Sequence, residues 1–145
     1  MLNQIINQIK PSFLANCVNS DSDQDAIEII YWLRFRISQP NTYTTYRVVV
    51  FRFYLWMRYR GVTLKTISNK EISDYIAFMH NPPFDWCGSR HHFSHPEWKP
   101  FRSKLSQSSI RFNIQLLKQL FNDLIESEYL KKSPIKSNLK PSSFI

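Results

Sequence analysis

The segment between Pro40 and Gly61 constrains the fold more than any other part of this sequence. Its apolar residues recur every three or four positions along one face, and others fill the remaining faces: Tyr43, Tyr46, Val49, Val50, Phe51, Phe53, Tyr54, Leu55, Trp56 and Met57. This spacing indicates an α-helix, and a helix that is apolar nearly all round needs other elements packed around it. Asn41 is a good N-cap and Gly61 a natural C-terminal stop. We therefore expect a central helix in an all-α domain.

Helical spacing also occurs in segments 2–9, 25–37, 69–79 and 107–124. Ser68 and Glu71 form a capping box before the third of these, and Ser106 is the expected N-cap of the last. Each of the last two has an apolar face, formed by Ile72, Tyr75, Ile76 and Met79 in one and by Ile110, Ile114, Leu117, Phe121 and Leu124 in the other. No repeat and no alternating strand pattern is found.

Three stretches lack helical spacing. The polar stretch 16–24 predicts a linker, so we divide the chain into an N-terminal arm and linker (1–24), a helical domain (25–132) and a basic linker or tail (133–145). The stretch 81–105 carries four prolines and predicts a loop, in which we expect Trp86 and Trp98 to hold the chain against the bundle. Trp32 and Trp56 lie in apolar helices and are expected in the core.

Composition excludes several classes of protein. With 145 residues, 43% of them hydrophobic, the chain is long enough for one domain with a real core. Two glycines cannot build a glycine-rich phosphate loop, and two cysteines are too few for a disulfide framework or a zinc ribbon. No apolar run approaches the roughly 20 residues of a membrane span, and no secretory signal is present. We expect a cytoplasmic protein without a cofactor, with no membrane partner.

The charge distribution points to a polyanionic partner. The formal net charge is +8, and the stretches 29–70 and 98–122 contain no acidic residue at all. A surface that faces phosphates excludes carboxylates because they would repel the ligand. The alternative interpretation is an ordinary solvated basic surface.

Two helix starts carry the candidate DNA-binding residues. On the last helix, Ser108, Arg111, Gln115, Lys118 and Asn122 form a polar stripe, with its cations in the N-terminal half, where they oppose the helix dipole unless an anion binds there. Short hydrogen-bonding residues and one arginine open the central helix. The predicted DNA-binding set is Thr42, Thr44, Thr45, Arg47, Lys65, Ser106, Ser108, Arg111, Gln115 and Lys118.

The cluster of Cys87, His91, His92 and His95 raises two other possibilities. One compact run would have to supply all the ligands of a zinc site, whereas structural sites pair ligands on two separate knuckles. A Cys–His nucleophile would need an orienting group and an oxyanion site, and neither is recognisable. We therefore expect loop histidines without a metal and no catalytic residue.

Two motifs resemble the core-binding domain of tyrosine site-specific recombinases, the phage-type integrases. The first is Asn41-Thr42-x-x-x-Tyr46-Arg47, followed by Phe53, Trp56 and Arg60-Gly61-Val62-Thr63-Leu64. The second is Leu105-Ser106-Gln107-Ser108-Ser109-Ile110-Arg111, followed by Leu117-Lys118-x-Leu120-Phe121-x-x-Leu124. The similarity spans residues 25–135. It implies a SAM-like orthogonal bundle of four to five helices, built from two crossed hairpins, which forms half of a clamp around double-stranded DNA at a recombination site.

The resemblance also sets expectations about catalysis and partners. The family's catalytic domain, with its His-x-x-Arg motif and tyrosine nucleophile, follows this part, and none of the four histidines here has an arginine three residues later. We expect binding without catalysis by this chain, beside other recombinase protomers on DNA. The alternative function is a helical protein-interaction module whose basic face meets an acidic partner.

Overall fold

The chain forms an all-α domain, as the sequence predicted. The computed structural model describes residues 23–36, 40–89, 91, 95 and 97–135, so the predicted helix 2–9, most of the linker and the end of the tail lie outside the described residues. The described elements are α2 (Gln24–Arg36), α3 (Pro40–Arg60), α4 (Asn69–His80), the 3-10 turn η2 (Phe84–Trp86) and α5 (Gln107–Glu126). In this part of the chain there is no β-strand, and none of the helices is long and apolar enough to cross a membrane.

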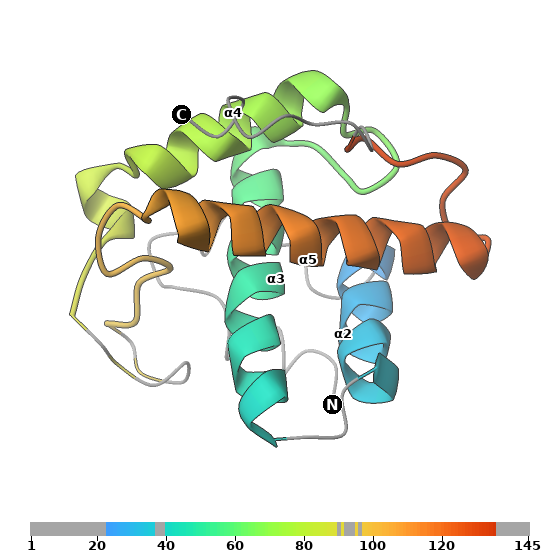
Figure 1. Cartoon of the computed structure of the whole chain (residues 1–145), viewed down its shortest axis with the longest axis horizontal. Helices are drawn as coiled ribbons and strands as arrows, with labels where there is room; N and C mark the ends of the chain where they lie inside the picture. The colour runs from blue at the N-terminus through green and yellow to red at the C-terminus, as the bar shows by residue number, and fades with distance from the viewer. Residues whose placement is uncertain (1–22, 37–39, 90, 92–94, 96, 136–145) are drawn as a thin grey trace.

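The helices form two layers (Figure 1). α2 and α3 lie side by side and run in opposite directions, while α4 and α5 run across them. α3 contacts both α2 and α5, and α4 packs against α5. This arrangement lays the N-terminal half of α5 across α3, although the two helices are far apart in sequence.

α3 is the centre of the core. Every residue from Val49 to Met57 is buried, as expected for a helix that is apolar on all faces. The ring of Phe53 packs edge-on against Tyr75 of α4 at 5.0 Å and against Phe121 of α5 at 6.0 Å between ring centres. The apolar faces predicted for α4 and α5 are all buried.

Local sequence signals explain where most helices begin and end. Gly61 ends α3 with a φ of 72°; its amide donates to Arg58 O at 3.2 Å and the next amide, of Val62, donates to Met57 O at 3.0 Å. This pair of bonds is a Schellman motif, which favours glycine. The Ser68 amide donates to the Glu71 carboxylate at 3.3 Å, and Ser106 Oγ accepts from the Ser109 amide at 3.2 Å, so both predicted N-terminal caps are present.

The predicted start of the central helix was wrong by a few residues. α3 begins at Pro40, so Asn41 lies inside the first turn and is not the N-cap; proline suits this position because its missing N–H would have no partner there. At the C-terminal side, the packed domain continues past residue 132. Ile135 is buried, and the side chain of Asn69 donates to Pro134 O at 3.2 Å.

The start of α2 is fixed by two buried carboxylates, which the sequence analysis had not identified. Asp23 caps the helix by accepting from the Ala26 amide at 3.2 Å, and its other oxygen accepts from the hydroxyl of Tyr54 on α3. Asp25 accepts from the Leu64 amide at 2.9 Å and from the hydroxyl of Tyr129, beyond α5. Contacts with the helical bundle therefore extend to Asp23, two positions before the predicted domain start at residue 25.

The long loop between α4 and α5 is held by its aromatic residues, as predicted. Trp86, Trp98 and Phe101 are buried. Phe101 also pairs with the chain near Cys87: its amide donates to Trp86 O and its carbonyl accepts from the Gly88 amide, both at 3.0 Å. A Cβ on Gly88 would lie 2.7 Å from the Lys99 side chain, so the close approach favours glycine here. The loop is thus closed at a neck between residues 86–88 and 101.

Candidate nucleic-acid interface

The N-terminal halves of α3 and α5 border a groove of about 470 Å³. It is lined by Thr44, Thr45, Val48, Val49, Arg52, Leu105, Ser108, Ser109, Phe112 and Asn113. We call it the α3–α5 groove. No acidic residue lines it, because α3 contains none and the acids of α5 come only at its C-terminal end. No carboxylate of the lining would therefore repel an anion in this groove.

Three residues of the predicted DNA-binding set meet in this groove. Thr44 and Thr45 line it from α3, and Ser108 lines it from α5. All three side chains are exposed. Thr42 is also exposed one turn earlier on α3, and Arg47 is half-buried with its guanidinium 5.5 Å from the centre of the Tyr43 ring.

The predicted stripe on α5 continues from the groove along the exposed side of that helix. Arg111 and Gln115 are exposed and Lys118 is half-buried. Among the described residues, Arg111 takes part in no ion pair. The cations of the stripe thus lie on the surface that begins at the groove.

Two residues of the predicted set have other places. Ser106 is exposed at the groove end of α5, but its hydroxyl oxygen already serves as the N-cap of the helix. Lys65 lies far from the groove, where its ammonium group is 4.7 Å from the centre of the Tyr129 ring, beyond the C-terminal end of α5. There it borders a second hollow, of about 730 Å³, together with Lys131 and Lys132. The structure does not bring Lys65 together with the helix starts.

Several cations of the acid-free stretch 29–70 are paired with acids or buried. Arg60 forms an ion pair with Asp74 at 3.1 Å, and Arg58 lies 3.7 Å from Asp23. Arg52 is buried: it donates to Pro100 O at 3.2 Å and to Asn113 Oδ1 at 3.0 Å, and its guanidinium lies 4.6 Å from the centre of the Phe101 ring. Acids distant in sequence therefore neutralise part of the basic segment.

Arg52 adds positive charge beneath the groove. Its hydrogen-bond partners are neutral, and among the described residues no carboxylate forms an ion pair with it. A charge in the low-dielectric interior acts over a longer range than one in water. Asn113, which holds the guanidinium, is itself fixed by donating to Ser109 O at 2.7 Å. The sequence does carry a signal for this pair. Asn113 interrupts the apolar face of one helix, and Arg52 stands within a helix that is apolar nearly all round.

The loop contains groups relevant to metal binding and to nucleophilic chemistry. Burial, followed by the charge of Asp85, raises the pKa of the Cys87 thiol, which disfavours the nucleophilic thiolate. In the described part of the chain, His91, His95 and Glu97 are the group that could hold a metal ion. In the sequence these histidines stand close to Cys87 and His92, and Glu97 was not among the predicted ligand candidates.

Comparison of the chain with protein-family models, with curated proteins and with solved structures gave no match.

Proposed function

We propose that this chain binds double-stranded DNA through the α3–α5 groove and the stripe on α5, as the amino-terminal clamp half of a tyrosine recombinase. The observation that carries the proposal is a groove without acids, lined by Thr44 and Thr45 from the second turn of α3 and by Ser108 from the first turn of α5. Helix N-termini and hydroxyl groups both donate hydrogen bonds to phosphates. The role is binding, in the cytoplasm, beside other protomers on the same DNA.

Each class of side chain has its own part in this mechanism. Arg47, Arg111 and Lys118 contact phosphates and release counterions, which supplies affinity that does not depend on sequence. Thr44, Ser108 and Gln115 carry the short or amide groups that reach sugar, backbone and base edges, and these contacts supply selectivity. The buried charge of Arg52 strengthens the attraction of the groove for phosphates without touching them.

The proposal is tested by DNA binding of surface variants. Arg111→Ala and Lys118→Ala are compared with wild type on a short fluorescent duplex by anisotropy at low salt, with EDTA present. We expect each to weaken binding about fivefold, which corresponds to about 1 kcal/mol for one phosphate contact. The thermal unfolding midpoint of Arg111→Ala should change little, because its side chain is exposed; that of Lys118→Ala is measured alongside, since Lys118 is half-buried.

Lys70→Ala is the matched control. Lys70 is an exposed cation on α4, outside the groove and the stripe, so its removal should leave DNA affinity nearly unchanged. Equal losses in all three variants would indicate attraction by net charge alone and would contradict a defined surface. Wild-type binding in both α5 variants, or no binding of the parent protein at low salt, would refute the proposal.

Exposed phenylalanines favour a second candidate, a protein-interaction module with an acidic partner. Phe112, 43% exposed, lines the α3–α5 groove beside the basic stripe, and Phe84 in the long loop is 96% exposed. Aromatic residues are enriched at protein interfaces. In that case short duplex DNA would not displace the partner, and Phe84→Ala or Phe112→Ala would weaken partner binding more than Arg111→Ala.

A further inference from the structure

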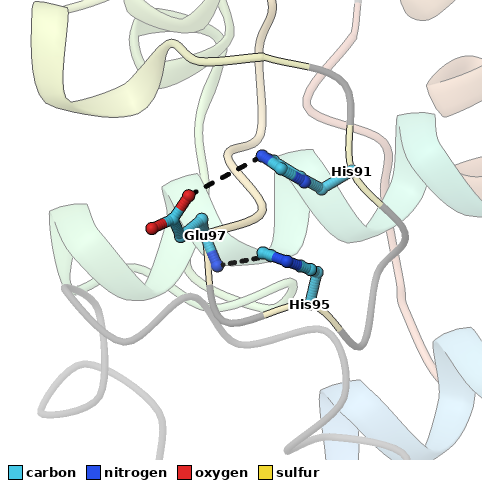
Figure 2. A group of neighbouring side chains, drawn as sticks. All are labelled: His91, His95 and Glu97. Carbon is cyan, nitrogen blue, oxygen red and sulfur yellow. Dashed lines mark hydrogen bonds and ion pairs between the residues drawn. The ribbon is translucent and has the colours of Figure 1, made fainter.

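The loop between α4 and α5 brings three metal-ligand side chains together (Figure 2). His91, His95 and Glu97 each offer one donor atom, and these three atoms lie within 4.8 Å of one another. His91 Nε2 is 3.9 Å from Glu97 Oε2, and the two imidazole rings stack with their centres 4.1 Å apart. The carboxylate therefore lies where both histidines can share an ion with it.

The backbone of the loop holds this cluster in place. The Trp98 amide donates to His95 O at 3.0 Å, and the indole of Trp98 is buried. Glu97 directly precedes Trp98, so the backbone of both His95 and Glu97 is tied to this one buried residue. On the other side, His91 follows the neck formed by residues 86–88 and 101. The cluster thus spans a loop whose two ends are already closed.

We propose that His91, His95 and Glu97 bind one divalent transition-metal ion of the zinc class, which ties residues 91–97 together. Two imidazoles and one carboxylate are the donor set that suits such an ion, and the exposure of Glu97 leaves a further coordination position for water. Ligand atoms around a tetrahedral zinc ion lie about 3.4 Å apart for bonds of about 2.1 Å. Rotation of the three loop side chains supplies the approach of at most about 1.4 Å that this requires.

One existing hydrogen bond must be exchanged when the ion binds through Nδ1 of His95. This atom accepts from the Glu97 amide at 3.0 Å, and the ion would take the same lone pair. The amide then turns to water, because Glu97 lies at the surface. The ion would add a cross-link between His91 and the His95–Glu97 part of the loop.

The test is titration of the full chain with Zn²⁺ by calorimetry and with Co²⁺ by visible absorption. We expect saturable one-to-one binding, a d–d band typical of four- or five-coordinate Co²⁺ with nitrogen and oxygen ligands, and a thermal unfolding midpoint that rises with Zn²⁺ and not with Mg²⁺. His91→Ala, His95→Ala and Glu97→Gln should each lower the affinity at least about tenfold. These side chains lie at the surface or near it, so all three variants should fold.

His92→Ala and His80→Ala are the matched controls and should retain the affinity of the parent protein. The absence of saturable one-to-one binding would overturn the proposal. Loss of binding in His92→Ala, with the three cluster variants unaffected, would overturn it too, because the ion would then use other ligands. The DNA-binding test is run with EDTA, so its outcome is independent of this one.

Discussion

At the scale of single residues, the polar groups of the core are mainly tyrosine hydroxyls and carboxylates. Tyr75 is completely buried between Phe53 and Trp56, with ring centres 5.0 and 4.9 Å away, and burial raises its pKa to about 12. Burial, reinforced by hydrogen bonds to Asp23 and Asp25, also raises the pKa values of Tyr54 and Tyr129. All three hydroxyls are thus held in their neutral form.

These tyrosines predict a loss of stability in alkaline solution. Below about pH 10 both the folded and the unfolded chain keep the Tyr75 proton, so its contribution is complete. Between about pH 10 and about pH 12 only the unfolded chain releases the proton, so the free energy of unfolding falls with rising pH. A shift of two pKa units corresponds to about 2–3 kcal/mol.

Urea denaturation between pH 8 and pH 12 measures this effect. Tyr75→Phe should lose stability less steeply above pH 10 than wild type, and Tyr31→Phe, whose side chain is half exposed, should follow the wild-type curve. An identical alkaline slope in wild type and Tyr75→Phe would show that Tyr75 does not contribute to it.

Glu128 predicts a stabilising substitution. It has a φ of 69° at the end of α5, where its amide donates to Ile125 O at 3.0 Å and the Tyr129 amide donates to Leu124 O at 2.9 Å. This is the same motif that Gly61 completes in α3. The left-handed conformation costs a residue with a side chain about 1–2 kcal/mol, and glycine avoids this cost. Glycine in turn costs about 0.5–1 kcal/mol because its unfolded state is more flexible.

Glu128→Gly should therefore raise the free energy of unfolding by about 0.5–1 kcal/mol, measured by urea denaturation at neutral pH. Glu128→Gln removes the charge and keeps the side chain, so a gain of equal size in that variant would attribute the effect to electrostatics and contradict the conformational explanation. Gly61→Ala should lower stability by about 1 kcal/mol.

At the scale of elements, the start of α5 combines a structural and a proposed binding role at Ser106. Its hydroxyl caps the helix, and Leu105 and Ser108 on either side of it line the groove. Ser106→Asp should keep the cap, because aspartate is a good N-cap that also interacts favourably with the helix dipole. The same carboxylate would repel phosphates at the mouth of the groove.

We therefore expect Ser106→Asp to retain wild-type stability while its DNA affinity falls about fivefold or more, by about 1 kcal/mol. Ser106→Asn, with an uncharged cap, should retain both, and Ser106→Ala should lose about 1 kcal/mol of stability. Thermal denaturation and anisotropy on the same samples separate the two effects. Unchanged DNA binding in Ser106→Asp would remove the start of α5 from the proposed interface.

The elements were predictable wherever a short sequence signal fixes local geometry. The apolar period of α4 and α5, the cap at Ser106 and the stop at Gly61 each act within a few residues of the chain, so the sequence analysis located them. Contacts between distant residues were not predictable in this way. Asp23 was assigned to a linker because its partners, Tyr54 and Arg58, lie more than thirty positions away.

The candidate site shows the same division. The stripe on α5 was predicted because its members share one face of one helix. The burial of Arg52 depends on Pro100, Phe101 and Asn113, which reach it only when α5 and the long loop pack against α3. Lys65 lies at Tyr129, away from the groove, because of the way the helices cross. The position of Lys65 in the sequence does not reveal this crossing.

At the scale of the whole molecule, charge is sorted between surfaces. Acids gather at the start of α2 and the end of α5, where Asp123 accepts from the Trp32 indole at 2.8 Å, while the groove and the stripe carry none. A surface that meets about six phosphates predicts a slope of roughly −5 for log affinity against log salt concentration.

Anisotropy titrations between 50 and 200 mM salt, about the range in which such slopes are measured, test this value. Arg111→Ala should make the slope less steep by about one, because one phosphate contact is lost. An affinity independent of salt would contradict binding to the DNA backbone.

The two carboxylates at the start of α2 have a mechanical consequence. Asp25 accepts from Tyr129 across 104 positions of sequence, so the two ends of the helical domain are fastened directly to each other. Force applied through the flanking segments would act on this hydrogen bond before it acted on the contacts of the aromatic core. If force were applied to both ends of the domain, the Asp25–Tyr129 hydrogen bond would break first, while the helices remained folded.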